Sequence, residues 1–132
     1  MISFGGAIEA FSNKQKLVTK SSFEAELVCA DSGVSSALWQ RRLLKDLGYG
    51  RMVPTVMYED NQSVIKAAAK GEGDFKRTKH IAMRFFSIKE NIDAGEVELK
   101  YLPTGDMLAD ILTKPLQGAL FRKLRDKLLG VL

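Results

Sequence analysis

Apolar residues along the chain follow two spacings, one typical of strands and one typical of helices. At the start, Ile2 and Phe4 alternate with small or polar residues, two glycines follow, and an extended pattern resumes over residues 7–11. This pattern predicts a β-hairpin with a tight glycine turn. Residues 16–19 are a further extended stretch that could continue the second strand.

A long helix is predicted next. Ser21 is a suitable N-cap, and Glu24 completes the spacing of a capping box. Apolar residues then recur every three or four positions, at Phe23, Leu27, Ala30, Val34, Leu38, Leu44 and Leu47. Gly33 stands among serines, which predicts a break into two helical segments. Gly48 is the expected C-cap.

The rest of the chain alternates between strand and helix patterns. We expect a buried strand at 54–58, a helix at 62–70, a helix from 78 to about 93, an amphipathic strand at 97–101, a helix at 106–114 stopped by Pro115, and a last helix around Leu124. This order predicts one α/β domain, residues 1–132, in which the two later strands pair in parallel. Ligands of such sheets lie at the carboxyl ends of strands, where Asp60 stands.

Composition adds limits on location and partners. The chain has 132 residues, 45% hydrophobic and 27% charged, as in an ordinary globular domain. It contains neither a membrane-spanning apolar run nor a secretory signal, and its single cysteine, Cys29, excludes an internal disulfide. We therefore expect an intracellular protein, in cytoplasm or nucleus, without a membrane partner. The net charge of +4 weakly favours an anionic partner, although basic clusters also occur on ordinary solvated helix faces.

Three acidic residues have apolar neighbours: Glu26, Asp60 and Asp110. A carboxylate in such a place costs desolvation energy unless it is paired or binds a metal. Converging carboxylates are the ligands of hard cations such as magnesium, and a two-metal site can hydrolyse a phosphodiester. Simpler roles remain open for each residue: a helix-dipole acid for Glu26, an N-cap for Asp60, and a partly exposed helix residue for Asp110.

Six segments carry a resemblance to a known family. They are GAI at 6–8 with KQ at 14–15 (similar to GGAIxWxSKKQ), SSFEAEL at 21–27 (SSxEAEY), ALWQRRLL at 37–44 (IWLRRLL), YEDNQS at 58–63 (YCDNQSAI), RTKHI at 77–81, and ADILTKPL at 109–116 (LADILTKPL). In this order they resemble the ribonuclease H domain of copia-type LTR retrotransposon polyproteins. Single motifs of this kind are weak, but six in the same order are specific.

The resemblance implies a ribonuclease H-like mixed sheet flanked by helices. It also implies that Glu26, Asp60 and Asp110 are catalytic acids that bind two magnesium or manganese ions and hydrolyse the RNA strand of an RNA–DNA hybrid. Glu26 is preferred to Glu24 because it precedes the family's aromatic position, and Asp110 to Asp106 because it lies within the LAD motif. The residues expected to contact nucleic acid are Asn61, Gln62, Lys76, Arg77, Lys79, His80 and Arg84. For His80 we expect packing or backbone contact rather than catalysis.

The sequence departs from the family at its start. Relatives carry an upstream central strand whose aspartate bridges both metals, and this sequence has no counterpart of it. We therefore expect a partial domain with an exposed sheet edge, open to pairing with another copy, and absent or very weak cleavage by this chain alone. Ala10 stands where the family usually has tryptophan, which also suggests that constraint on this sequence is relaxed. The alternatives are a non-catalytic nucleic-acid-binding module, a domesticated fragment acting by protein–protein association, and a remnant without function.

Overall fold

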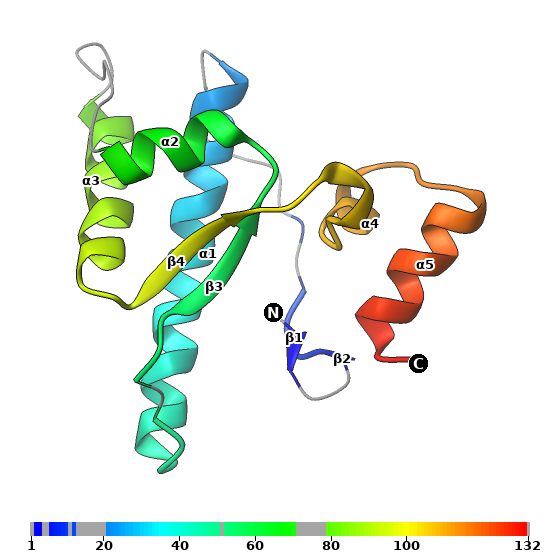
Figure 1. Ribbon diagram of the computed structural model, residues 1–132, viewed down its shortest axis with the longest axis horizontal. Coiled ribbons are helices and arrows are strands. Elements are labelled where there is room, and N and C mark those ends of the chain that lie inside the picture. The colour runs from blue at the N-terminus through cyan, green and yellow to red at the C-terminus, as the bar shows by residue number, and fades with distance from the viewer. Residues whose placement is uncertain are drawn as a thin grey trace. The chain divides into compact units, whose positions relative to one another are not determined.

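The computed structural model describes residues 2–3, 6–10, 12, 21–50, 52–70 and 79–131. The elements, in chain order, are β1 (Ile2–Ser3), β2 (Gly6–Ala7), α1 (Ser22–Asp46), β3 (Thr55–Glu59), α2 (Gln62–Lys70), α3 (Lys79–Asp93), β4 (Val97–Tyr101), the 3-10 helix η1 (Thr104–Asp106), α4 (Asp110–Thr113) and α5 (Gly118–Leu129) (Figure 1). They form two compact units. The central unit is Leu17–Tyr101, and the terminal unit joins Met1–Lys16 to Leu102–Leu132. The predicted α/β class is confirmed.

The sheet of the central unit is a parallel pair. Thr55 of β3 lies opposite Val97 of β4, and Glu59 lies opposite Tyr101, so the predicted parallel pairing is confirmed. Parallel strands need a crossover connection, which α2 and α3 supply. The prediction that β3 is buried was wrong, because Val56 and Tyr58 are 38% and 57% exposed. The packed helices cover one face of this sheet, so alternate side chains of β3 remain in solvent.

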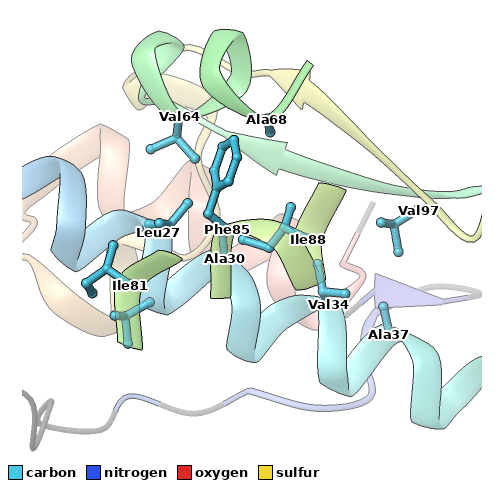
Figure 2. Packing of buried hydrophobic residues seen from close by; sticks show 11 residues of the cluster. Leu27, Ala30, Val34, Ala37, Val64, Ala68, Ile81, Phe85, Ile88 and Val97 are labelled. Carbon is cyan, nitrogen blue, oxygen red and sulfur yellow. The ribbon is translucent and has the colours of Figure 1, made fainter. Parts of the chain in front are cut away.

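The core of the central unit lies between α1, α2, α3 and the sheet (Figure 2). Its buried members are Leu27, Val28, Ala30, Val34, Ala37, Val64, Ala68, Ile81, Phe85, Ile88 and Val97. Figure 2 shows the Phe85 ring pointing from α3 towards α2, beside Val64. Buried positions of α3 follow spacings of four and three, as the apolar pattern predicted. Burying a large side chain such as Phe85 contributes about 1.5–3 kcal/mol to folding.

Helix α1 is continuous, so the predicted break at Gly33 was wrong. The glycine serves a contact instead: a Cβ at this position would lie 2.8 Å from Cε of Met57 in β3. The predicted cap at the start of α1 is confirmed, because Ser21 Oγ accepts the backbone N–H of Glu24 at 3.2 Å. Gly48, one residue beyond the observed C-cap, has a φ of +83° and ends the helix in a Schellman motif.

The terminal unit contains the predicted hairpin, in which Ile2 pairs with Ala7 and Ser3 with Gly6. Gly6, which was expected in the turn, belongs to the second strand and pairs with Ser3. This strand ends at Ala7, earlier than expected, and residues 16–19 lie outside the described residues. Strand β2 contacts α5, where a Cβ on Gly6 would lie 3.3 Å from the carbonyl oxygen of Leu129. The last helix is confirmed as α5.

The predicted helix at 106–114 is replaced by two short helices, η1 and α4. Met107, which lies between them, has an extended backbone with a ψ of 103°, so the helical hydrogen bonds do not continue from η1 into α4. The side chain of Asp106 forms an exposed ion pair with α5, in which its Oδ1 lies 2.6 Å from Nζ of Lys123. Lys114, before Pro115, ends α4 as expected.

The strands that the structure describes form two separate pairs, β1 with β2 and β3 with β4. The single mixed sheet that we expected is therefore not formed by these strands. β1 and β2 form backbone hydrogen bonds with each other in the hairpin. Strand β2 of this hairpin packs on α5 rather than on a third strand. Among the helices in the described ranges, none is both long and apolar enough to cross a membrane.

Candidate metal centre

Three carboxylates meet at the carboxyl end of β3. Glu26 comes from α1, Glu59 is the last residue of β3, and Asp60 follows it directly. Their ligand oxygens all lie within 4.8 Å of one another. The structure thus brings together two of the three acids singled out in the sequence, Glu26 and Asp60, and adds Glu59.

Local geometry explains how the three side chains converge. The cap at Ser21 fixes the start of α1 and so places Glu26 in its first turns. At the end of β3 the chain turns directly into α2, and Asn61 Oδ1 accepts the backbone N–H of Ser63 at 3.0 Å, capping that helix. The strand end and the capped helix therefore hold Glu59 and Asp60 at a sharp turn facing α1.

Glu59 is the buried member of the cluster, at 9% exposure. Desolvation raises the pKa of its carboxyl group, and the nearby carboxylates of Glu26 and Asp60 raise it further. The backbone N–H groups of Asn61 and Asp60 oppose this shift, and the first of them donates to Glu59 Oε1 at 2.9 Å. The net effect is a carboxyl group whose ionised form is disfavoured while no cation is near.

The thiol of Cys29 lies one turn along α1 from Glu26. Desolvation of the thiol, followed by the negative charges of Glu26 and Glu59, raises its pKa, although the residue as a whole is exposed. A thiol with a raised pKa is a poor nucleophile, because the thiolate is the reactive form. Cys29 is therefore not a candidate catalytic group.

The donor set fits a hard divalent cation. Carboxylate oxygens are the preferred ligands of magnesium and manganese, and three of them at one point offer both the charge and the ligand type. A cation at this place would also offset the mutual repulsion of Glu26, Glu59 and Asp60. The side chains present are therefore compatible with the metal that the resemblance implies.

Asp110, the third predicted acid, belongs to the terminal unit. It begins α4, is only 7% exposed, and its Oδ2 lies 2.8 Å from Nζ of Lys114. A buried carboxylate needs such a partner or a metal. Glu26 and Asp60 belong to the central unit, so the approach of Asp110 to them stays a prediction.

The residues expected to contact nucleic acid differ in their exposure and in the partners of their side chains. Lys79 and Gln62 are exposed, whereas the side chain of Asn61 caps α2. Arg84 is half-buried and pairs with Asp31 of α1. His80 is exposed at the start of α3, and Lys76 and Arg77 lie outside the described residues.

Glu59 is the candidate ligand that the sequence analysis missed. The expected strand ended at Tyr58, and the similar family segment has cysteine where this chain has Glu59. The alternation of side chains along a strand could have indicated it. If the strand is extended by one residue, Glu59 lies on the same face as Thr55 and Met57. That face is the one turned towards α1.

Comparison with known proteins finds Pol polyproteins of plant transposons among the relatives. The chain is 35% identical over 117 residues to the retrovirus-related Pol polyprotein from transposon RE1 of Arabidopsis thaliana, and equally to that from transposon RE2. It is 36% identical over 110 residues to the corresponding polyprotein from transposon TNT 1-94 of Nicotiana tabacum. These alignments cover 83–89% of this chain but only 8% of each polyprotein.

No family model matches the chain, and no solved structure matches it. The alignments span both units, because they cover more of the chain than either unit contains. The chain is thus homologous to one segment of the retrovirus-related Pol polyproteins of transposons.

Proposed function

We propose that this chain is the ribonuclease H region of a retroelement Pol polyprotein, and that its reaction is metal-dependent hydrolysis of the RNA strand of an RNA–DNA hybrid. The observation that carries the proposal is the convergence of Glu26, Glu59 and Asp60 at the carboxyl end of β3. It occurs in a chain whose relatives are Pol polyproteins. Two of these three acids are the ones that the family motifs mark.

In this proposal Glu26 and Asp60 hold magnesium or manganese, with Asp110 as a further ligand. A bound ion would activate water and stabilise the leaving oxygen of the phosphodiester. Glu59 adds negative charge to the site, and the N–H of Asn61 fixes the orientation of its carboxylate. Lysine and arginine residues near the start of α3 are proposed to bind the phosphate backbone, which makes binding dependent on salt concentration.

Manganese binding tests the site directly. We expect isothermal titration calorimetry to show that Asp60→Asn lowers Mn²⁺ affinity by roughly tenfold or more, since even indirect partners of a metal contribute about 10–100-fold. Asp46→Asn is the matched control, because this exposed acid lies at the opposite end of α1. If the wild type and Asp60→Asn bind Mn²⁺ with equal affinity, the proposed metal centre is wrong.

A second candidate function is self-association through the sheet. Val56 and Tyr58 are exposed on one face of β3, and β3 and β4 have only each other as strand partners within the described part of the chain. Unpaired strand edges favour pairing with another copy. If this candidate is right, sedimentation velocity will show a dimer that Val56→Lys shifts towards monomer. A wild-type chain that stays monomeric at high concentration contradicts it.

A further inference from the structure

Helix α1 has apolar side chains on two opposite sides. Its buried residues, among them Val34, face α2, α3 and the sheet (Figure 2). Leu43 follows Val34 by nine residues, or about two and a half helical turns, and therefore lies on the opposite side. That side carries the residues that we call the outer stripe, which recur at spacings of three or four: Cys29, Ser32, Ser36, Trp39, Leu43 and Leu47.

The outer stripe ends in three large apolar residues that solvent reaches. Trp39 is 62% exposed, Leu43 42% and Leu47 62%. A surface helix of a globular domain has one apolar side, which it buries in the core, whereas a helix that is apolar on opposite sides is buried on both. The exposed end of the stripe therefore indicates a surface that another molecule covers.

The polar groups of the outer stripe do not oppose an apolar contact. None of its six residues is charged, in a chain with 27% charged residues. The hydroxyl of Ser32 donates to the backbone carbonyl oxygen of Val28 at 3.1 Å, so it makes its hydrogen bond within its own helix. Apolar atoms can cover such a serine without leaving its hydroxyl unsatisfied. The stripe therefore suits another uncharged surface and not the phosphates of a nucleic acid.

Side-chain size changes along the outer stripe in a way that makes it complementary to itself. The three residues of its first half are small, and the three of its second half are large. If two copies of α1 pack antiparallel, with a twofold axis passing near residues 37 and 38, every large residue meets a small one. The facing pairs are Trp39 with Ser36, Leu43 with Ser32, and Leu47 with Cys29. A twofold dimer requires a surface with this self-complementarity.

We propose that the outer stripe is a dimer interface, on which α1 of a second copy of this chain packs antiparallel. The contact from Cys29 to Leu47 spans about 27 Å of helix. One pair of helices buries less surface than the roughly 800 Å² per partner of a standard interface, so the dimer should be weak and reversible. This assembly does not depend on the proposed hydrolysis, and its interface on α1 differs from the sheet surface of the second candidate function.

Sedimentation velocity tests the interface. The wild type should change from monomer to dimer as its concentration rises through the micromolar range. Leu43→Ser should weaken dimerisation by about tenfold or more, because every dimer loses two buried leucines. Adding Ser32→Leu to this variant should restore dimerisation, since each leucine again faces a serine. Adding Ser35→Leu instead is the matched control, because Ser35 is exposed but lies outside the stripe, and it should not restore dimerisation.

The single cysteine of the chain gives a second readout. In the dimer Leu47 of the other copy covers Cys29, so alkylation of this thiol by a maleimide should slow as the wild-type concentration rises. In Leu43→Ser the rate should not change with concentration. A wild type that stays monomeric, or a dimer that Leu43→Ser leaves intact, overturns the proposal. Equal restoration by Ser32→Leu and Ser35→Leu also overturns it, as does a dimer that Val56→Lys dissolves, because that dimer would form through the sheet.

Discussion

Gly33 of α1 packs against the end of the Met57 side chain of β3. A Cβ at position 33 would lie 2.8 Å from Cε of Met57, closer than carbon atoms of neighbouring side chains approach. The Met57 side chain is flexible, and its end would have to move to admit a Cβ at this position. The contact lies where the helix meets the strand that ends in Glu59 and Asp60.

Gly33→Val should lower the free energy of unfolding by about 1 kcal/mol, at the low end of the range for overpacking, because the flexible end of Met57 can move to relieve part of the clash. Gly33→Ala should change it little, since roughly 1 kcal/mol of helix propensity offsets the smaller clash. Urea unfolding measures both. Ser32→Val, at the neighbouring exposed position, controls for a β-branched residue in the helix. If Gly33→Val costs as much in a Met57→Ala background as in the wild type, the contact is not the cause.

Arg41 joins α1 to the start of both central strands. Its Nε lies 2.6 Å from Oε2 of Glu96, and its Nη1 donates to the carbonyl oxygen of Val53 at 2.8 Å and to Thr55 Oγ1 at 3.2 Å. Because one ammonium group cannot reach these three acceptors, Arg41→Lys should destabilise the chain by about 1–3 kcal/mol. Thermal unfolding beside Arg42→Lys, an exposed neighbour, measures the effect. Equal stabilities of the two variants would contradict this role.

The ion pair of Asp106 makes stability depend on pH. The hydrogen bond and the positive charge of Lys123, with a smaller contribution from Lys127, lower the pKa of this carboxyl group from its ordinary value of 3.8. The ionised form thus stabilises the fold above the unfolded-state pKa, and this stabilisation is lost as pH falls through the lowered folded-state pKa. Asp106→Asn should therefore melt earlier than the wild type at neutral pH, and together with it once the pH is below the lowered folded-state pKa.

The effect of Asp106 should be small, because the pair is exposed and screened by salt. Raising the salt concentration to about 1 M should reduce the difference in melting temperature at neutral pH. Asp46→Asn, which removes an exposed acid from α1, serves as the control. A difference that persists at low pH would show that Asp106 acts through packing instead.

Features set by neighbouring residues were predictable from the sequence. The bounds of α2 and β4 were predicted correctly, and so was the cap at Ser21, because spacing and capping chemistry determine them locally. Contacts between distant segments were not predictable. The contact of Gly33 with Met57 joins two elements far apart in the sequence, and so does the ion pair of Asp106 with Lys123 of α5.

The candidate site was predictable only in part. Family motifs marked Glu26 and Asp60, which the structure brings together with Glu59. Glu59 was missed because a single residue at the strand end decides whether its side chain turns towards α1 or away. The exposure of Tyr58 has the same origin, since burial of β3 depends on which face the helices cover.

Cleavage of an end-labelled RNA–DNA hybrid in the presence of Mn²⁺ tests the central claim most directly. From the sequence alone we expected absent or very weak cleavage, but Glu59 adds a third carboxylate beside Glu26 and Asp60. We therefore predict slow cleavage of the RNA strand that requires the metal, disappears in Asp60→Asn and persists in Asp46→Asn. A folded wild-type chain that binds Mn²⁺ and leaves the hybrid intact would contradict the claim, and so would an Asp60→Asn variant that cleaves as fast as the wild type.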